Sequence, residues 1–146
     1  MKRLVGLLAI LGLFLTACSD TFIYQKSLVE FSERFAQANA DENLDAMLEL
    51  YDTDNLQERD LAILKTALSF EIGLPILSIS FEGLSGAPEE SIDYEHDGIS
   101  YQASLTPKLR MLVVYEIEGR LSSKFSIGRN SNKEWKIITA IPHNKK

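Results

Sequence analysis

Cysteine and histidine are scarce in this sequence. Its 146 residues include one cysteine and two histidines, His96 and His143. One cysteine excludes an intramolecular disulfide, and neither histidine has the partner four residues away that a helical zinc site needs. A basic stripe with interleaved aromatic residues is also missing, which argues against nucleic acid as a partner. We therefore expect no metal site, no cofactor and no catalytic motif.

Long hydrophobic runs are limited to one, and that run is short for a membrane span. Residues 4–15 are almost all apolar and follow Lys2 and Arg3. A spanning helix needs about 20 apolar residues, whereas a shorter run after basic residues is typical of a secretion signal. We expect residues 1–17 to be a signal peptide that is removed on export.

The residues after this run suggest a lipid anchor. Leu15-Thr16-Ala17-Cys18 resembles the lipobox of bacterial lipoproteins, which implies that Cys18 receives lipid and that residues 18–26 form a lipidated tether. Attachment of lipid would also remove the reactivity of an unpaired thiol in an exported protein. The same resemblance implies a periplasm-facing protein of the bacterial cell envelope, and Ser19 favours the outer membrane over the inner. A plain secretory signal with a chance cysteine is the alternative.

The mature chain is acidic. Removal of residues 1–17 leaves 13 basic against 21 acidic residues, a formal charge of −8. Such a charge mainly promotes solubility.

Three amphipathic helices are predicted in the first half of the mature chain. Asp41 is expected to cap the second helix, which ends near Tyr51. Asp54, with Gln57 three residues later, is expected to cap the third helix, which stops at Gly73. The first helix ends near Ala40, and its apolar stripe has spacings of three and four: Tyr24, Leu28, Phe31, Phe35 and Ala38.

The second half alternates with period two, as strands do. Asp97-Gly98 and Gly119-Arg120 are expected to turn two hairpins, and Gly83 to Glu90 reads as a flexible loop. The expected strands cover residues 76–82, 91–95, 99–105, 110–118, 121–127 and 134–141. Residues 143–146 form a tail.

This order predicts one α+β domain over residues 27–142, with N-terminal helices packed on a curved antiparallel sheet of about five to six strands. Three segments resemble the cone-shaped cystatin-like and NTF2-like families: Phe35-Ala36-Gln37-Ala38, Leu50-Tyr51 and Glu134-Trp135-Lys136-Ile137. The resemblance implies a pocket between helices and sheet. Its candidate lining residues are Tyr51, Tyr101, Tyr115 and Trp135, with simple core packing as the alternative.

Two near-motifs carry no chemistry. Asp93 to Gly98 resembles the start of a calcium loop, but the twelfth position is Ser104 instead of the closing glutamate. Gly83 to Ala87 approaches a nucleophile elbow, but Ala87 replaces its last glycine. His96 with Asp93 or Glu95 lies at an expected hairpin tip, where water opposes the pKa tuning of an acid or base.

The lack of a catalytic motif and the expected signal peptide with its lipobox-like segment together favour a lipid-anchored, non-catalytic binding or accessory lipoprotein. Its partners would be the membrane, through lipid on Cys18, and an envelope protein or a small ligand. Two alternatives stay open. One is a small pocketed NTF2-like enzyme, a hydrolase or isomerase, which requires an enclosed acid beside an apolar cavity. The other is an envelope-assembly subunit that binds through an exposed apolar patch.

Overall fold

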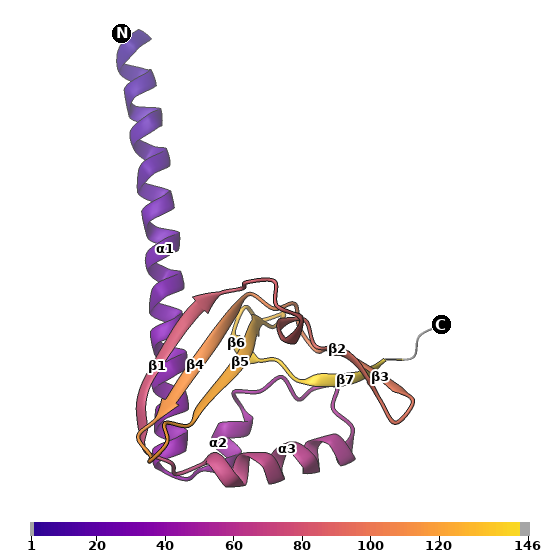
Figure 1. The fold of residues 1–146 in the computed structure, drawn as a ribbon. Helices are drawn as coiled ribbons and strands as arrows, with labels where there is room; N and C mark the ends of the chain where they lie inside the picture. The colour runs from indigo at the N-terminus through magenta and orange to yellow at the C-terminus, as the bar shows by residue number, and fades with distance from the viewer. Residues whose placement is uncertain (1, 144–146) are drawn as a thin grey trace.

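The chain forms an α+β fold in which helices pack against antiparallel sheets (Figure 1). The computed structural model describes the backbone of residues 2–143 and the side chains of residues 21–143. His143 ends the last strand, and the rest of the expected tail lies outside the described residues.

Helix α1 spans Lys2–Ala40 and supplies most of the helical core. Leu28, Phe31, Phe35 and Ala38 are buried, as their spacing predicts. Helical backbone also covers residues 18–26, which we expected as a tether. Lipid attachment to Cys18 concerns a side chain outside those described and stays a prediction.

Helices α2 (Leu44–Leu48) and α3 (Glu58–Glu71) begin later than their predicted caps allow. Asn43 caps α2, because its Oδ1 accepts the Ala46 N–H at 3.0 Å. Asp41 instead accepts a hydrogen bond from the Gln37 side chain. Asp54 falls in a turn before α3, whose N-cap position is taken by Gln57 without a side-chain bond. Both predicted caps were therefore wrong.

The larger sheet has four antiparallel strands in the order β1-β4-β5-β6. These are β1 (Ile76–Gly83), β4 (Leu109–Tyr115), β5 (Ser122–Arg129) and β6 (Trp135–Ile137). Alternation places Met111, Val113 and Tyr115 on the inner face, where they are buried against the helices. Gly119 and Arg120, both with positive φ, turn the β4–β5 hairpin as predicted.

The smaller sheet has the order β2-β3-β7. The Asp97-Gly98 turn joins β2 (Asp93–His96) to β3 (Ile99–Ala103), and β7 (Ala140–His143) pairs with the other edge of β3. The predicted strand over 134–141 is thus two strands in two sheets. The described chain has seven strands instead of the five to six expected, because the backbone changes sheet at Ile138 and Thr139.

A buried side chain joins the end of α1 to the turn after α3. The Asn39 Nδ2 donates to the Leu74 carbonyl oxygen at 2.8 Å, and its Oδ1 accepts the Gly73 N–H at 3.1 Å. Gly73 has a φ of 86°, a conformation that glycine adopts without strain. This turn ends α3 and starts β1.

No helix among the described residues is both long enough and apolar enough to cross a membrane.

Candidate functional site

The main candidate site is a groove of about 490 Å³ between α3 and the smaller sheet. In Figure 1, α3 runs beneath the β2–β3 hairpin and β7. The groove is lined mainly by apolar and aromatic side chains, and its size falls within the usual range for small-molecule sites.

The helical wall of the groove comes from one face of α3. Asp60, Ile63, Leu64 and Ala67 are spaced by three or four residues, so they share this face. Leu68 turns inward and is buried in the core, which fixes how the helix is rotated. The packing of Leu68 in the core therefore determines which side chains of α3 line the groove.

The opposite wall carries two stacked tyrosines. Tyr94 on β2 is paired directly with Tyr101 on β3, and their ring centroids lie 5.2 Å apart with the planes 16° from parallel. Burial raises the pKa of Tyr94, and the Tyr101 phenol and the Asp60 carboxylate raise it further. The Tyr94 hydroxyl therefore stays protonated and can donate a hydrogen bond.

The floor of the groove is held by backbone pairing beyond the sheets. Residue Tyr51 bridges to Ile137 as a one-residue parallel strand, and the Asp52 N–H donates to the Ile137 carbonyl at 2.9 Å. The Thr139 hydroxyl donates to the Asp52 carbonyl at 2.7 Å. These bonds hold Tyr51 beside Ile138 and Thr139 in the floor.

The space between the helices and the larger sheet is closed. Its remaining cavity measures about 10 Å³ and lies among residues such as Phe35, Met47 and Tyr115, which is about the volume that one water needs. The Tyr115 hydroxyl donates to Glu71 at 3.2 Å, and the Ser123 hydroxyl donates to the same oxygen at 3.1 Å. Burial, with the Glu71 charge, raises the pKa of Tyr115. A ligand would have to bind outside this interior.

The structure brings together two of the four candidate lining residues. Tyr51 and Tyr101 both line the groove. Tyr115 lies in the closed interior, and Trp135 is buried at the start of β6. Tyr94, which the sequence analysis did not single out, lines the groove beside Tyr101. Pairing across the Asp97-Gly98 turn is the signal that could have found it.

Trp135 belongs to a cluster that fastens α1 to the sheet. The Arg129 guanidinium lies 4.7 Å from the Trp135 ring centroid and 5.3 Å from that of Tyr24. Ser27 Oγ accepts bonds from the Trp135 indole at 3.0 Å and from Arg129 at 3.2 Å. This arrangement is cation–π packing around one shared acceptor.

The ionisable residues of the β2–β3 hairpin do not form an enclosed catalytic group. The side chain of His96 is 72% exposed, and its Nε2 lies 3.4 Å from Asp97 Oδ2. Asp93 and Glu95 are also exposed. The enzyme alternative requires such groups to meet in an enclosed cavity. Within the described part of the chain, no cluster of three or more histidine, cysteine or acidic side chains can hold a metal ion.

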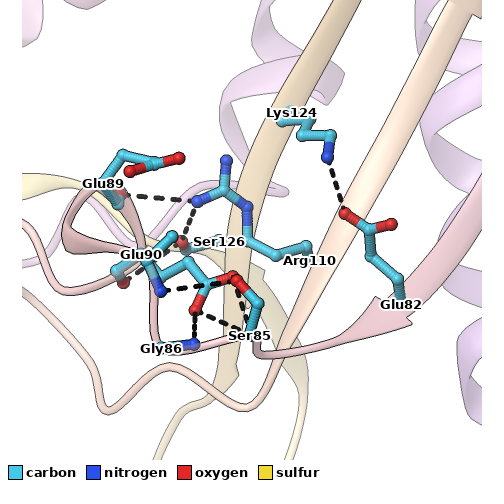
Figure 2. Close-up of polar contacts among 9 residues, drawn as sticks. Glu82, Ser85, Gly86, Glu89, Glu90, Arg110, Lys124 and Ser126 are labelled. Atoms are coloured by element: carbon cyan, nitrogen blue, oxygen red, sulfur yellow. Dashed lines mark hydrogen bonds and ion pairs between the residues drawn. The ribbon is translucent and has the colours of Figure 1, made fainter.

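The segment after β1 is folded back and held by a buried carboxylate. Figure 2 shows Glu90, at the end of a short 3-10 turn (Pro88–Glu90), accepting the N–H groups of Ser85 and Gly86 at 2.9 and 2.8 Å and the Ser85 hydroxyl at 2.8 Å. These bonds, the Ser85 N–H first, lower the pKa of Glu90. Gly83 to Glu90 was expected to be a flexible loop, but these hydrogen bonds order it.

A buried arginine lies beneath the same loop. Arg110 is 7% exposed, and its Nη1 lies 3.4 Å from both the Glu89 carbonyl oxygen and the Ser126 hydroxyl (Figure 2). Its Nε has no partner among the described residues. Nearby, Lys124 pairs with Glu82 at 2.8 Å. Arg110 therefore connects the loop to β4 and β5 through long contacts.

The side of α3 next to the groove is an exposed apolar surface. Phe70 is 78% exposed and Ile63 is 57% exposed. With Arg59, Ala62, Thr66 and Ala67, they form what we call the outer face of α3, which shares Ile63 and Ala67 with the groove.

No protein-family model and no curated protein matches this chain.

Proposed function

We propose that this chain is a lipid-anchored, non-catalytic binding protein of the bacterial cell envelope, facing the periplasm, and that it takes a small and mainly apolar ligand into the groove. The groove itself carries this proposal. It combines an aliphatic helical wall, two stacked tyrosines and a few polar groups, which is the usual composition of a small-molecule site.

The tyrosines supply both apolar contact and polar orientation. Their rings offer large flat surfaces, and their hydroxyl groups can bond to a ligand. Thr139 is less available, because its hydroxyl is already bonded to the Asp52 carbonyl. The groove therefore favours a ligand whose polar groups are few.

The ligand part of the proposal is tested with 4-phenylbutanol, an uncharged probe that suits the groove in size and polarity. The protein is purified as cells make it and placed in nanodiscs of zwitterionic lipid, and dissociation constants come from ligand-observed NMR, with empty nanodiscs subtracted. We expect saturable binding that Ala67→Phe abolishes by filling the groove.

A matched substitution on the same helix controls for added bulk. Ala62 is exposed and lies on the outer face of α3, and it does not line the groove. Ala62→Phe should bind 4-phenylbutanol as the unaltered protein does. No saturable binding, or equal loss in both variants, would contradict the groove as the binding site.

The anchor is tested separately at Cys18. We expect radiolabelled palmitate to label the protein and the envelope fraction to retain it, and Cys18→Ser to lose both properties. The support for the anchor is the Leu15-Thr16-Ala17-Cys18 segment after an apolar run. Each buried methylene contributes only about 0.8 kcal/mol to membrane attachment, so durable anchoring needs more than one acyl chain. An unmodified thiol in the mature protein would refute the anchor.

The outer face of α3 favours a second candidate, an envelope-assembly subunit that binds another envelope protein. Exposed apolar surface of this kind marks many protein interfaces, and Phe70 is its most exposed large apolar residue. Crosslinking in intact envelopes discriminates the two functions. A partner lost in Phe70→Ser but kept in Tyr94→Ala, which alters the groove and not the outer face, would support the assembly role.

A further inference from the structure

The groove has an uneven charge distribution. Asp60 is the only acidic residue that lines it, and no lysine or arginine is among its described lining residues. Among the described lining residues, the one other titratable group besides the tyrosines is His96, whose exposed imidazole lies beside Asp97. A charged ligand group in the groove would therefore face a carboxylate with no competing cation from the helical wall.

Asp60 has a free carboxylate in the described structure. It is half-buried in the first turn of α3, and no hydrogen bond or ion pair to it occurs among the described residues. The partial positive charge at a helix N-terminus favours an ionised acid there. Asp60 thus offers a negative charge on the groove wall.

Asp60 and the two stacked tyrosines line the same groove. Asp60 on α3 and Tyr94 on β2 both line the groove, and the Asp60 charge is one of the causes, after burial and Tyr101, that raise the pKa of Tyr94. Aromatic faces attract cations, more strongly where water is displaced. A carboxylate opposite stacked tyrosines is an arrangement suited to an organic cation.

The surroundings reinforce this preference. The β2–β3 hairpin carries three further exposed acids, Asp93, Glu95 and Asp97. Fields of one sign over a cleft raise the local concentration of oppositely charged ligands. Anionic ligands are disfavoured by the same charges.

We infer that the groove selects ligands whose apolar body carries one cationic group, an ammonium or a guanidinium, with the cation held between Asp60 and the Tyr94–Tyr101 pair. This inference rests on the proposed function, because it assigns a ligand class to the same groove. The apolar body lies along Ile63, Leu64 and Ala67.

Three probes with one apolar body test the charge preference. They are 4-phenylbutylamine, which is cationic at neutral pH, the uncharged 4-phenylbutanol and the anionic 4-phenylbutyrate, titrated into the protein in zwitterionic nanodiscs. We expect the amine to bind about tenfold more tightly than the alcohol, which corresponds to about 1.4 kcal/mol, and the carboxylate to bind most weakly. Added salt should reduce the difference.

Asp60→Asn is the decisive variant, because it keeps the side-chain shape and removes the charge. It should bring the affinity for the amine down to that for the alcohol. Glu118→Gln makes the same charge change at an exposed turn away from the groove and should leave the tenfold preference intact.

The outcomes separate this inference from the proposed function. Equal binding of amine and alcohol, tighter binding of the carboxylate, or an unchanged preference in Asp60→Asn would overturn the ligand class while leaving the groove as a binding site. Binding of none of the probes would overturn both.

Discussion

Replacing Gly128 by alanine is expected to destabilise the domain strongly, because strand β5 passes very close to another segment there. A Cβ at residue 128 would lie 2.6 Å from the Thr106 carbonyl oxygen, which is 0.4 Å inside the 3.0 Å below which such contacts essentially do not occur. The obstacle is backbone, so no side-chain rotation can relieve the contact.

The segment around Thr106 is also held on both sides. The Ser104 N–H donates to the Thr139 carbonyl at 2.9 Å, and the Lys108 N–H donates to the Ile127 carbonyl at 2.9 Å. Moving Thr106 away would weaken these bonds. We therefore expect Gly128→Ala to cost about 3 kcal/mol of the free energy of unfolding, the upper end for overpacking, and to lower Tm by about 10 °C.

Two other glycines separate the steric effect from the backbone effect. Gly83 has neither a positive φ nor an atom within 4 Å of an added Cβ, so Gly83→Ala should change stability by less than about 0.5 kcal/mol. Gly119 has open space but a φ of 88°, so Gly119→Ala should cost about 1 kcal/mol. Urea unfolding followed by the fluorescence of Trp135 measures all three. If Gly128→Ala proves as stable as Gly83→Ala, the Thr106 segment is not fixed as described.

Three further substitutions test the polar contacts. Glu90→Gln should lower stability at neutral pH. The deficit should shrink as pH falls below 4.5, because the lowered pKa of Glu90 stabilises the fold only while the carboxylate is ionised, as urea unfolding at several pH values can measure. Asn39→Ala should cost about 3 kcal/mol in urea unfolding, since it leaves two backbone groups without partners. Ser27→Ala removes the shared acceptor of Trp135 and Arg129, so it should shift the tryptophan emission and cost about 1 kcal/mol.

Matched controls accompany these substitutions. Glu89→Gln alters the neighbouring acid, whose side chain makes no hydrogen bond among the described residues, and should show no comparable pH dependence. The Ser32 hydroxyl donates to the carbonyl oxygen three residues earlier, as the Ser27 hydroxyl does. Ser32→Ala removes this bond without affecting the indole of Trp135, so tryptophan emission should stay unchanged. An Asn39→Ala protein as stable as the unaltered one would show that water replaces the lost bonds.

Local patterns in the sequence predicted most of the elements. The spacing of Leu28, Phe31 and Phe35 gave the buried face of α1, because the period of a helix is a property of the chain itself. The Asp97-Gly98 and Gly119-Arg120 turns were found for the same reason, since the backbone conformation of a tight turn restricts its residues. The caps were harder, because Asp41, Asn43 and Asp54 are all suitable cap residues and packing decides among them.

The groove and the ordered loop could not be predicted, because both depend on distant parts of the chain. No glycine or proline interrupts residues 134–141, so no turn signal shows that the backbone leaves β6 at Ile138 and then forms β7, which pairs with β3. The burial of Glu90 likewise depends on the turn from Pro88 bringing its carboxylate back to Ser85. Tyr51 and Tyr101 were identified as candidate lining residues, and pairing across the Asp97-Gly98 turn could have added Tyr94, whereas Asp60 required the structure.

The position of β7 makes the last residues of the chain important for how the protein behaves when it is shortened. β7 covers one edge of β3, so a premature stop after Ile138 would leave the main-chain groups along that edge unpaired while the four-stranded sheet kept all its strands. An open strand edge is a template for pairing with other chains. A truncated product would therefore pair with other chains along β3 and form intermolecular sheets.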